Sequence, residues 1–178
     1  MSGSWPSPTR KYENDGGPGV RRIVELLRNQ SSSPDEDVQS FVDAIAFNWL
    51  IAGTDAHAKN YSLLLGKGAG VRLAPIYDLA SILPYRTVDL RRVKLAMKIG
   101  GEYRLRNIGL RHWQRLATEL HLDEGTIIDR IRVMASTLPD HATDVQKQIE
   151  GEGLSHATIT KLSERLKARA SACQKLLQ

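Results

Sequence analysis

The sequence predicts a mainly α-helical domain that contains one small β-hairpin. Apolar residues recur at a spacing of three and four in five segments, which is the pattern of helices with one buried face. A glycine-rich stretch separates two short apolar runs, which is typical of a hairpin. With 41% hydrophobic and 25% charged residues, the 178-residue chain has the composition of one globular domain.

The amino-terminal residues are predicted to be irregular. Residues 1–20 hold three prolines and four glycines and lack hydrophobic periodicity, so we expect a lead-in to a domain over residues 21–178. Apolar residues at helical spacing predict a short first helix over residues 20–29.

The second predicted helix carries a wide apolar stripe and is therefore expected in the core. Its start is predicted by Ser33 as the capping hydroxyl, Pro34 in the first turn and Glu36 in a capping box. Gly53 is expected to end it, because a dense polar stretch follows.

Two short strands, residues 61–65 and 71–74, are predicted to form the hairpin. Pro139 is expected to end one of the later helices and Ser155 to cap another. These later helices are predicted over residues 111–122, 124–138 and 155–177.

The polar loop between the core helix and the hairpin carries residues suited to catalysis and metal binding. Asp55 and Asn60 are five residues apart, and Asp78 follows beyond the hairpin. This is the order in which protein kinases place an aspartate that orients the substrate hydroxyl, an asparagine that binds metal, and a second metal-binding aspartate. Carboxylate and amide oxygens suit Mg²⁺, and the hairpin would return the chain so that Asn60 and Asp78 meet.

Four segments resemble the HipA family of serine/threonine toxin kinases over roughly residues 9–140. They are TDAHAKNYS, APIYDL, KYENDGGPG and KLAM, at residues 54–62, 74–79, 11–19 and 94–97. The resemblance implies the carboxy-terminal lobe of a protein-kinase-like fold, with Asp55 as the catalytic aspartate and Asn60 and Asp78 as magnesium ligands.

The same resemblance implies phosphorylation of protein serine or threonine, with ATP as co-substrate and Mg²⁺ as cofactor. It implies a HipB-like helix-turn-helix antitoxin as partner, DNA bound indirectly with that antitoxin, and an aminoacyl-tRNA synthetase as a possible substrate. Family members are more than twice as long, and the sequence before residue 35 shows no strand–glycine-loop–strand unit. We therefore expect the ATP-binding lobe to be absent from this chain and to be needed for activity.

Two further residues of the loop are candidates for the site. His57 is interpreted mainly as a residue that organises the loop, and Lys59 either contacts a phosphate or is a surface lysine. A weaker alternative is a metal-dependent hydrolase that uses Asp55, His57 and Asp78. It would need at least one more ligand, and the remaining histidines lack the paired spacing of such sites.

Positive charge is concentrated in one window. Residues 86–115 hold nine basic and two acidic residues, a net +7 in a chain of net charge +5. Such a window either attracts polyanions or is a solvated, partly paired surface of helices and loops. If it attracts polyanions, the competing function is a non-catalytic module that binds an antitoxin or DNA. The candidate contacts are Arg91, Arg92, Lys98, Arg104 and Arg106.

The cellular compartment is predicted from three absences. The most apolar run is too short to span a bilayer, so no membrane association is expected. The first residues do not resemble a signal peptide, and Cys173 is the single cysteine. We therefore expect a cytoplasmic protein.

Overall fold

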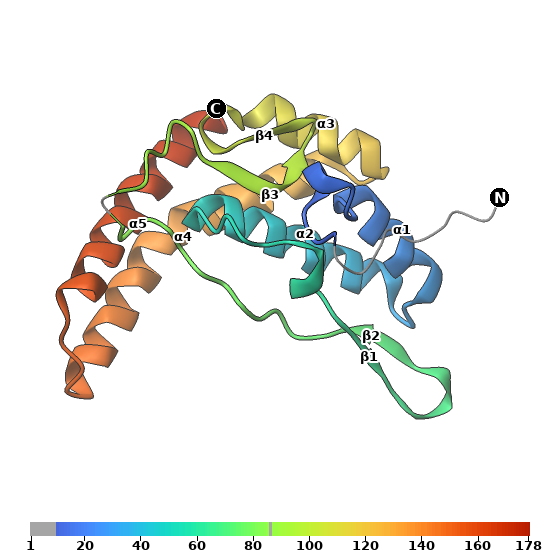
Figure 1. Ribbon diagram of the computed structural model, residues 1–178, viewed down its shortest axis with the longest axis horizontal. Coiled ribbons are helices and arrows are strands. Elements are labelled where there is room, and N and C mark those ends of the chain that lie inside the picture. The colour runs from blue at the N-terminus through green and yellow to red at the C-terminus, as the bar shows by residue number, and fades with distance from the viewer. Residues whose placement is uncertain (1–9, 86) are drawn as a thin grey trace.

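The computed structural model describes residues 10–85 and 87–178, and within them it confirms the mainly helical fold (Figure 1). Short strands pair in two antiparallel hairpins, β1–β2 and β3–β4. In chain order the elements are α1 (Val20–Gln30), α2 (Pro34–Ile51), β1 (Leu63–Leu65), β2 (Val71–Leu73), β3 (Lys94–Ile99), β4 (Glu102–Arg104), α3 (Leu110–Leu120), α4 (Glu124–Gly151) and α5 (Ala157–Leu176).

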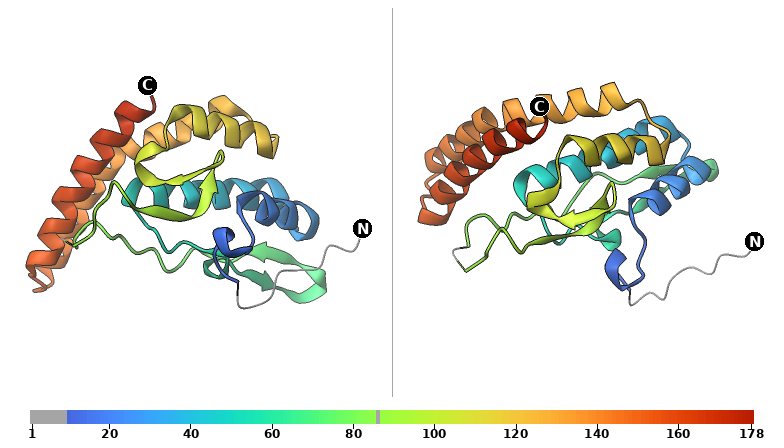
Figure 2. Two further views of the ribbon diagram at one scale, coloured as in Figure 1. Left: turned by 45° about the horizontal axis from the view of Figure 1, so that its top comes forward. Right: turned by 90° about the horizontal axis from the view of Figure 1, so that it is seen from above.

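Helix α2 lies at the centre of the core and leads directly into the polar loop. Its Trp49 is fully buried and meets Trp113 of α3 edge-to-face, with ring centroids 5.6 Å apart. The guanidinium of Arg169 in α5 donates to the Trp49 carbonyl oxygen at 3.0 Å. Figure 2 shows α4 and α5 side by side as an antiparallel pair at one end of the molecule. The end of α2, which precedes the loop, is therefore held by two other helices.

The start of α2 differs from the predicted capping box. Ser33 makes no side-chain cap, although Pro34 does occupy the first turn. Ser31 takes the local role instead, because its hydroxyl accepts from the Ser33 amide at 3.0 Å and donates to Asp37 at 2.6 Å. Glu36 pairs with Arg72 of β2 at 2.9 Å rather than with the backbone. The charged first turn of α2 thus binds the hairpin.

Asp37 is the buried anchor of that hairpin. Its carboxylate accepts from the Leu73 amide at 2.7 Å and from the Arg72 guanidinium at 3.0 Å. Burial by itself would raise the pKa of Asp37, but the hydrogen bonds from Arg72, Ser31 and Leu73 outweigh it and lower the pKa.

We expect Asp37→Ala to lower the free energy of unfolding by about 2 kcal/mol at pH 7, because several hydrogen bonds to a carboxylate are lost. A group with a lowered folded-state pKa stabilises the fold above the ordinary carboxyl pKa, and this contribution is lost as pH falls through the folded-state value. Urea denaturation at several pH values should therefore show the difference between wild type and variant shrinking below about pH 4. Glu36→Ala, which removes only the exposed partner of Arg72, is the control and should have little effect. Equal losses in both variants would contradict the anchoring role.

The other end of α2 also departs from the prediction. Ala52, with φ 56°, is the left-handed residue that ends the helix, and Gly53 follows it. Glycine is required at position 53 for space, since a Cβ there would collide with the side chain of Asn48. The predicted glycine stop is therefore displaced by one residue.

Pro139 does not end a helix as predicted, because α4 continues to Gly151. Proline cannot donate to the carbonyl four residues earlier. The Ala135 carbonyl oxygen accepts instead from the Gln174 amide of α5 at 3.2 Å, so a side chain replaces the missing backbone donor. Helix α5 begins after His156, whose ring accepts from the Thr158 amide, and not at a Ser155 cap. No helix in the described parts of the chain is long and apolar enough to cross a membrane.

The β3–β4 hairpin was not predicted, because β3 has no alternating pattern. Three consecutive residues of β3 are buried, with exposed lysines on either side of them. Lys94 lies opposite Arg104 in the register, and the turn holds Gly100 and Gly101, both with positive φ. The hairpin packs beside α3 (Figure 2). The fold therefore contains a second small hairpin in addition to the predicted one.

Candidate active site

The segment before α1 is ordered from residue 10 onward and forms one wall of the site. Residues 10–19 of the predicted irregular lead-in contain a single 3₁₀ turn and are otherwise without regular secondary structure, and residues 1–9 lie outside the described part. Glu13 begins a short 3₁₀ helix, η1 (Glu13–Asp15), and its carboxylate accepts from the Lys98 amide of β3 at 2.7 Å. A Cβ at Gly19 would collide with that carboxylate. The hydrogen bond of Glu13 to β3 thus fixes the position of the two residues before Glu13, which are Lys11 and Tyr12.

Asp55 is exposed at the tip of the polar loop, and Oδ1 of its carboxylate faces three groups. The Tyr12 hydroxyl donates to it at 2.6 Å. The Lys11 ammonium lies 3.8 Å away and the His57 Nε2 3.9 Å away. The hydrogen bond with Tyr12 and the charge of Asp55 raise the pKa of Lys11. Asp55 therefore lies beside one cation, Lys11, while its side chain stays 62% exposed.

The backbone of the loop is folded into a tight turn around His57 and Asn60, both of which are buried. The His57 amide donates to the Asp55 carbonyl oxygen at 2.8 Å and to Asn60 Oδ1 at 3.2 Å. The His57 ring packs edge-to-face on Tyr12, with centroids 5.4 Å apart. His57 thus lies within the framework of the loop. The Lys59 side chain is exposed, and no described carboxylate lies within ion-pair distance of it.

Asn60 and Asp78 are brought together, as the sequence predicted for a hairpin between them. The Asn60 side-chain amide donates to an Asp78 carboxylate oxygen. Asp78 has φ 57°, a left-handed conformation that aspartate and asparagine tolerate better than most residues. The neighbouring Tyr77 hydroxyl donates to the Lys59 carbonyl oxygen at 3.0 Å and contacts the Ser62 hydroxyl at 2.7 Å. These bonds join the segment that carries Asp78 to the polar loop.

The donor set fits magnesium better than zinc. Asp78 offers carboxylate oxygen atoms, and the hard oxygen of Asn60 is Oδ1, which here accepts from the His57 amide. One or two carboxylates beside nucleotide phosphates are the usual protein contribution to a Mg²⁺ site. Among residues 10–85 and 87–178, no group of three or more His, Cys, Asp or Glu side chains is placed to hold a metal. The additional ligand that the hydrolase alternative requires is thus not found in the described part of the chain.

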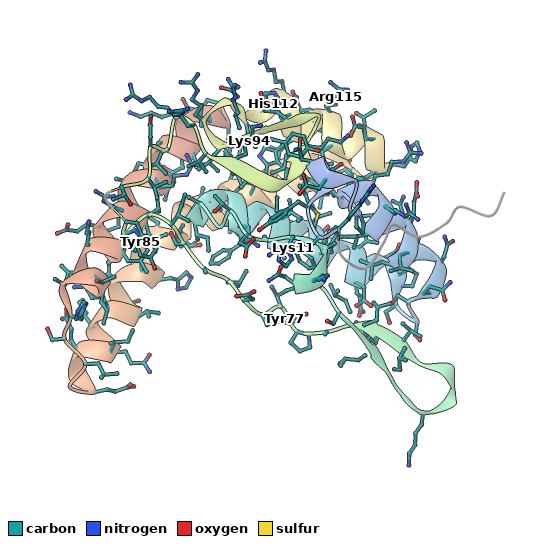
Figure 3. All side chains as sticks on the ribbon, viewed as in Figure 1. Lys11, Tyr77, Tyr85, Lys94, His112 and Arg115 are labelled. Carbon is teal, nitrogen blue, oxygen red and sulfur yellow. The ribbon has the colours of Figure 1, made fainter. Side chains whose placement is uncertain are left out.

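The predicted basic residues differ in whether an acidic partner lies beside them. Arg91 is paired with Asp89, and Lys98 points to Glu13, 3.4 Å away. Arg92, Arg104 and Arg106 are exposed, and no described carboxylate lies within 4 Å of their guanidinium groups. Figure 3 shows Lys94, His112 and Arg115 on the β3–α3 side of the molecule and Lys11 beside the polar loop.

Tyr12 is the site residue that sequence reasoning missed. It belongs to the KYENDGGPG segment, which resembles the family but was given no chemical role. It contacts Asp55 across 43 residues of sequence, and no local pattern reports such a contact. The resemblance of residues 11–19 to the family is the sequence feature that singles out this segment.

Comparison with known proteins identifies the domain. The family model of the HipA-like C-terminal domain matches residues 2–142. The putative kinase Y4mE of Sinorhizobium fredii is 31% identical over 163 residues, which cover 92% of this chain and 38% of that protein. The serine/threonine-protein kinase toxin HipA of Shewanella oneidensis is 27% identical over 149 residues, which cover 78% of this chain and 34% of the toxin. The chain thus spans less than two fifths of the length of either relative.

A solved structure supports the same fold. The complex of Shewanella oneidensis HipA with HipB and its operator DNA contains a chain that superposes with a TM-score of 0.83 at 22% identity. The match covers 96% of this chain and 42% of the other. The mainly helical, HipA-like fold that the resemblance implied is therefore confirmed. Because the family model covers most of its length, this chain belongs to the HipA-like C-terminal domain family.

Proposed function

We propose that this chain is the catalytic lobe of a HipA-like kinase that transfers the γ-phosphoryl group of ATP to a serine or threonine of a protein. The observation that carries the proposal is the contact between Asn60 and Asp78 on the same loop system that exposes Asp55. Three side chains with the order and chemistry of a kinase site thereby belong to one connected loop system.

Each residue has a separate task in this proposal. Asp55 orients the acceptor hydroxyl and takes its proton as the acceptor oxygen bonds to the γ-phosphorus and the bond from that phosphorus to the leaving ADP breaks. Asn60 and Asp78 would hold Mg²⁺, which when bound neutralises the charge of the nucleotide phosphates. Lys59, exposed beside Asn60, is available for a phosphate or the acceptor protein. His57 keeps the turn between Asp55 and Asn60 closed through its backbone amide.

The test is phosphoryl transfer by the chain alone and by the chain preceded by the amino-terminal part of Y4mE. The second form supplies the region of the relatives that this chain does not span. We expect Mg²⁺-dependent labelling of serine or threonine from γ-labelled ATP in the second form, and an aminoacyl-tRNA synthetase belongs among the acceptors because the family resemblance implies one. Failure of both forms with every acceptor would count against the proposal. Metal-dependent hydrolysis without ATP would favour the hydrolase alternative.

A second candidate function is binding of DNA together with a HipB-like antitoxin. Its support is the set of exposed guanidinium groups of Arg92, Arg104 and Arg106, which lack nearby described carboxylates. Phosphate contacts by such groups give affinity that depends on salt and tolerates sequence changes, so base recognition would come from the antitoxin.

We expect Arg104→Glu combined with Arg106→Glu to weaken binding of duplex DNA and to reduce the slope of log K against log salt by about 2, since two phosphate contacts are lost. The matched control is Lys67→Glu combined with Lys147→Glu, which changes net charge equally at exposed sites on other elements. Fluorescence titration at several salt concentrations, with and without antitoxin, measures both. Equal effects of the two double variants would show that Arg104 and Arg106 contribute only their net charge and make no specific contact with DNA.

A further inference from the structure

The hydroxyl of Tyr12 forms a hydrogen bond with the carboxylate of Asp55. We propose that Tyr12 is a positioning residue for Asp55: its hydroxyl holds Oδ1 so that Oδ2 is presented to the acceptor hydroxyl. This inference rests on the proposed kinase function and assigns a role to a residue outside the polar loop. It makes the segment before α1 part of the catalytic apparatus.

The contacts of the Asp55 carboxylate are divided unequally between its two oxygen atoms. Oδ1 accepts from the Tyr12 hydroxyl at 2.6 Å and faces Lys11 and His57 at 3.8 and 3.9 Å. For Oδ2, the described residues offer no hydrogen-bond partner. One oxygen is therefore fixed by the protein, and the other remains available at the surface.

The donor is itself held in place from several directions. The Tyr12 carbonyl oxygen accepts from the Gly17 amide at 2.8 Å, and its ring packs on His57. The Lys11 carbonyl oxygen accepts from the Ala58 amide at 3.4 Å, which joins the segment to the loop. On the other side, the Glu13 carboxylate binds Lys98 of β3. Tyr12 can therefore restrict an exposed side chain that would otherwise rotate freely.

A tyrosine hydroxyl on the catalytic aspartate could also obstruct the acceptor. In that case it would need to occupy the side of the carboxylate that the acceptor uses. The exposure of Asp55 and the unpartnered Oδ2 favour positioning instead. The two roles predict opposite changes in rate when the hydroxyl is removed.

The test is Tyr12→Phe, which removes the hydroxyl and keeps the ring on His57. In the form that transfers phosphate, we expect kcat to fall about 10- to 100-fold, the scale of a lost hydrogen bond to a charged group. KM for ATP should stay within about twofold, because the nucleotide contacts are unchanged. Tyr85→Phe, at a tyrosine that lies far from Lys11 in Figure 3, is the control and should have no effect. An unchanged or increased kcat in Tyr12→Phe would overturn the proposal.

A second measurement separates this inference from the proposed function. Crystal structures of the chain alone, wild type and Tyr12→Phe, report the side-chain rotamer of Asp55 without any need for activity. We expect the carboxylate to leave its position in the variant while residues 10–19 stay in place. An unmoved carboxylate would overturn the positioning role even if the kinase assay succeeds, and a moved one would support it even if the assay fails.

Discussion

Asp55→Asn and Asp78→Asn are each expected to reduce phosphoryl transfer at least about 100-fold while leaving the fold intact. The first change removes the carboxylate that takes the acceptor proton, and the second weakens the proposed hold on Mg²⁺. Both replacements keep the shape of the side chain, and asparagine tolerates the left-handed backbone of residue 78. Single-turnover transfer from γ-labelled ATP, in the form of the protein that is active, measures the loss.

The matched control is Asp144→Asn, which makes the same chemical change at an exposed position of α4. It should transfer phosphate at the wild-type rate. Thermal denaturation of all three variants tests whether the fold is retained. If Asp55→Asn or Asp78→Asn kept a rate near that of the control, the assignment of that residue would be wrong.

Gly100→Ala is expected to give the largest loss of stability, about 3 kcal/mol. Gly100 has φ +52°, and a Cβ there would collide with the backbone carbonyl of His112 in the first turn of α3. The cost combines an unfavourable backbone conformation with overpacking against a helix that cannot easily move. Because Glu13 is anchored on β3, a shift of this hairpin would also displace the segment that carries Tyr12.

Gly68→Ala is the control for that stability change. Gly68 also has a positive φ, +70°, but no atom lies within 4 Å of the place of a Cβ. The control should therefore cost only about 1 kcal/mol, the backbone term alone. Urea denaturation measures the free energy of unfolding of both variants. Similar losses would show that the close approach of Gly100 to α3 does not contribute to the cost of the substitution.

The helices were predictable because their apolar periodicity reports burial directly, whereas their ends were not. Caps depend on competition between neighbouring side chains, and Ser31 took the local role expected of Ser33 because its hydroxyl also meets Asp37. Pro139 failed as a stop because a distant residue, Gln174, supplies the donor that proline lacks. Such replacements come from tertiary contacts, which no local window contains.

Some contacts in the site could be predicted from the sequence and others could not. The meeting of Asn60 with Asp78 followed from a hairpin that the sequence shows clearly. The contact of Tyr12 with Asp55 depends on how Glu13 docks on β3, a strand without an alternating pattern. The polar loop could therefore be predicted, but the segment that holds it could not.

The most direct test of the account is the location of the metal. A crystal structure of the chain preceded by the amino-terminal part of Y4mE, with Mn²⁺ in place of Mg²⁺ and a non-hydrolysable ATP analogue, would show the ion by its anomalous scattering. We predict a manganese peak about 2.2 Å from oxygen atoms of Asp78 and Asn60, beside the nucleotide phosphates. A peak bound by His57 together with Asp55, or one remote from both Asn60 and Asp78, would contradict the assignment of this loop as a kinase site.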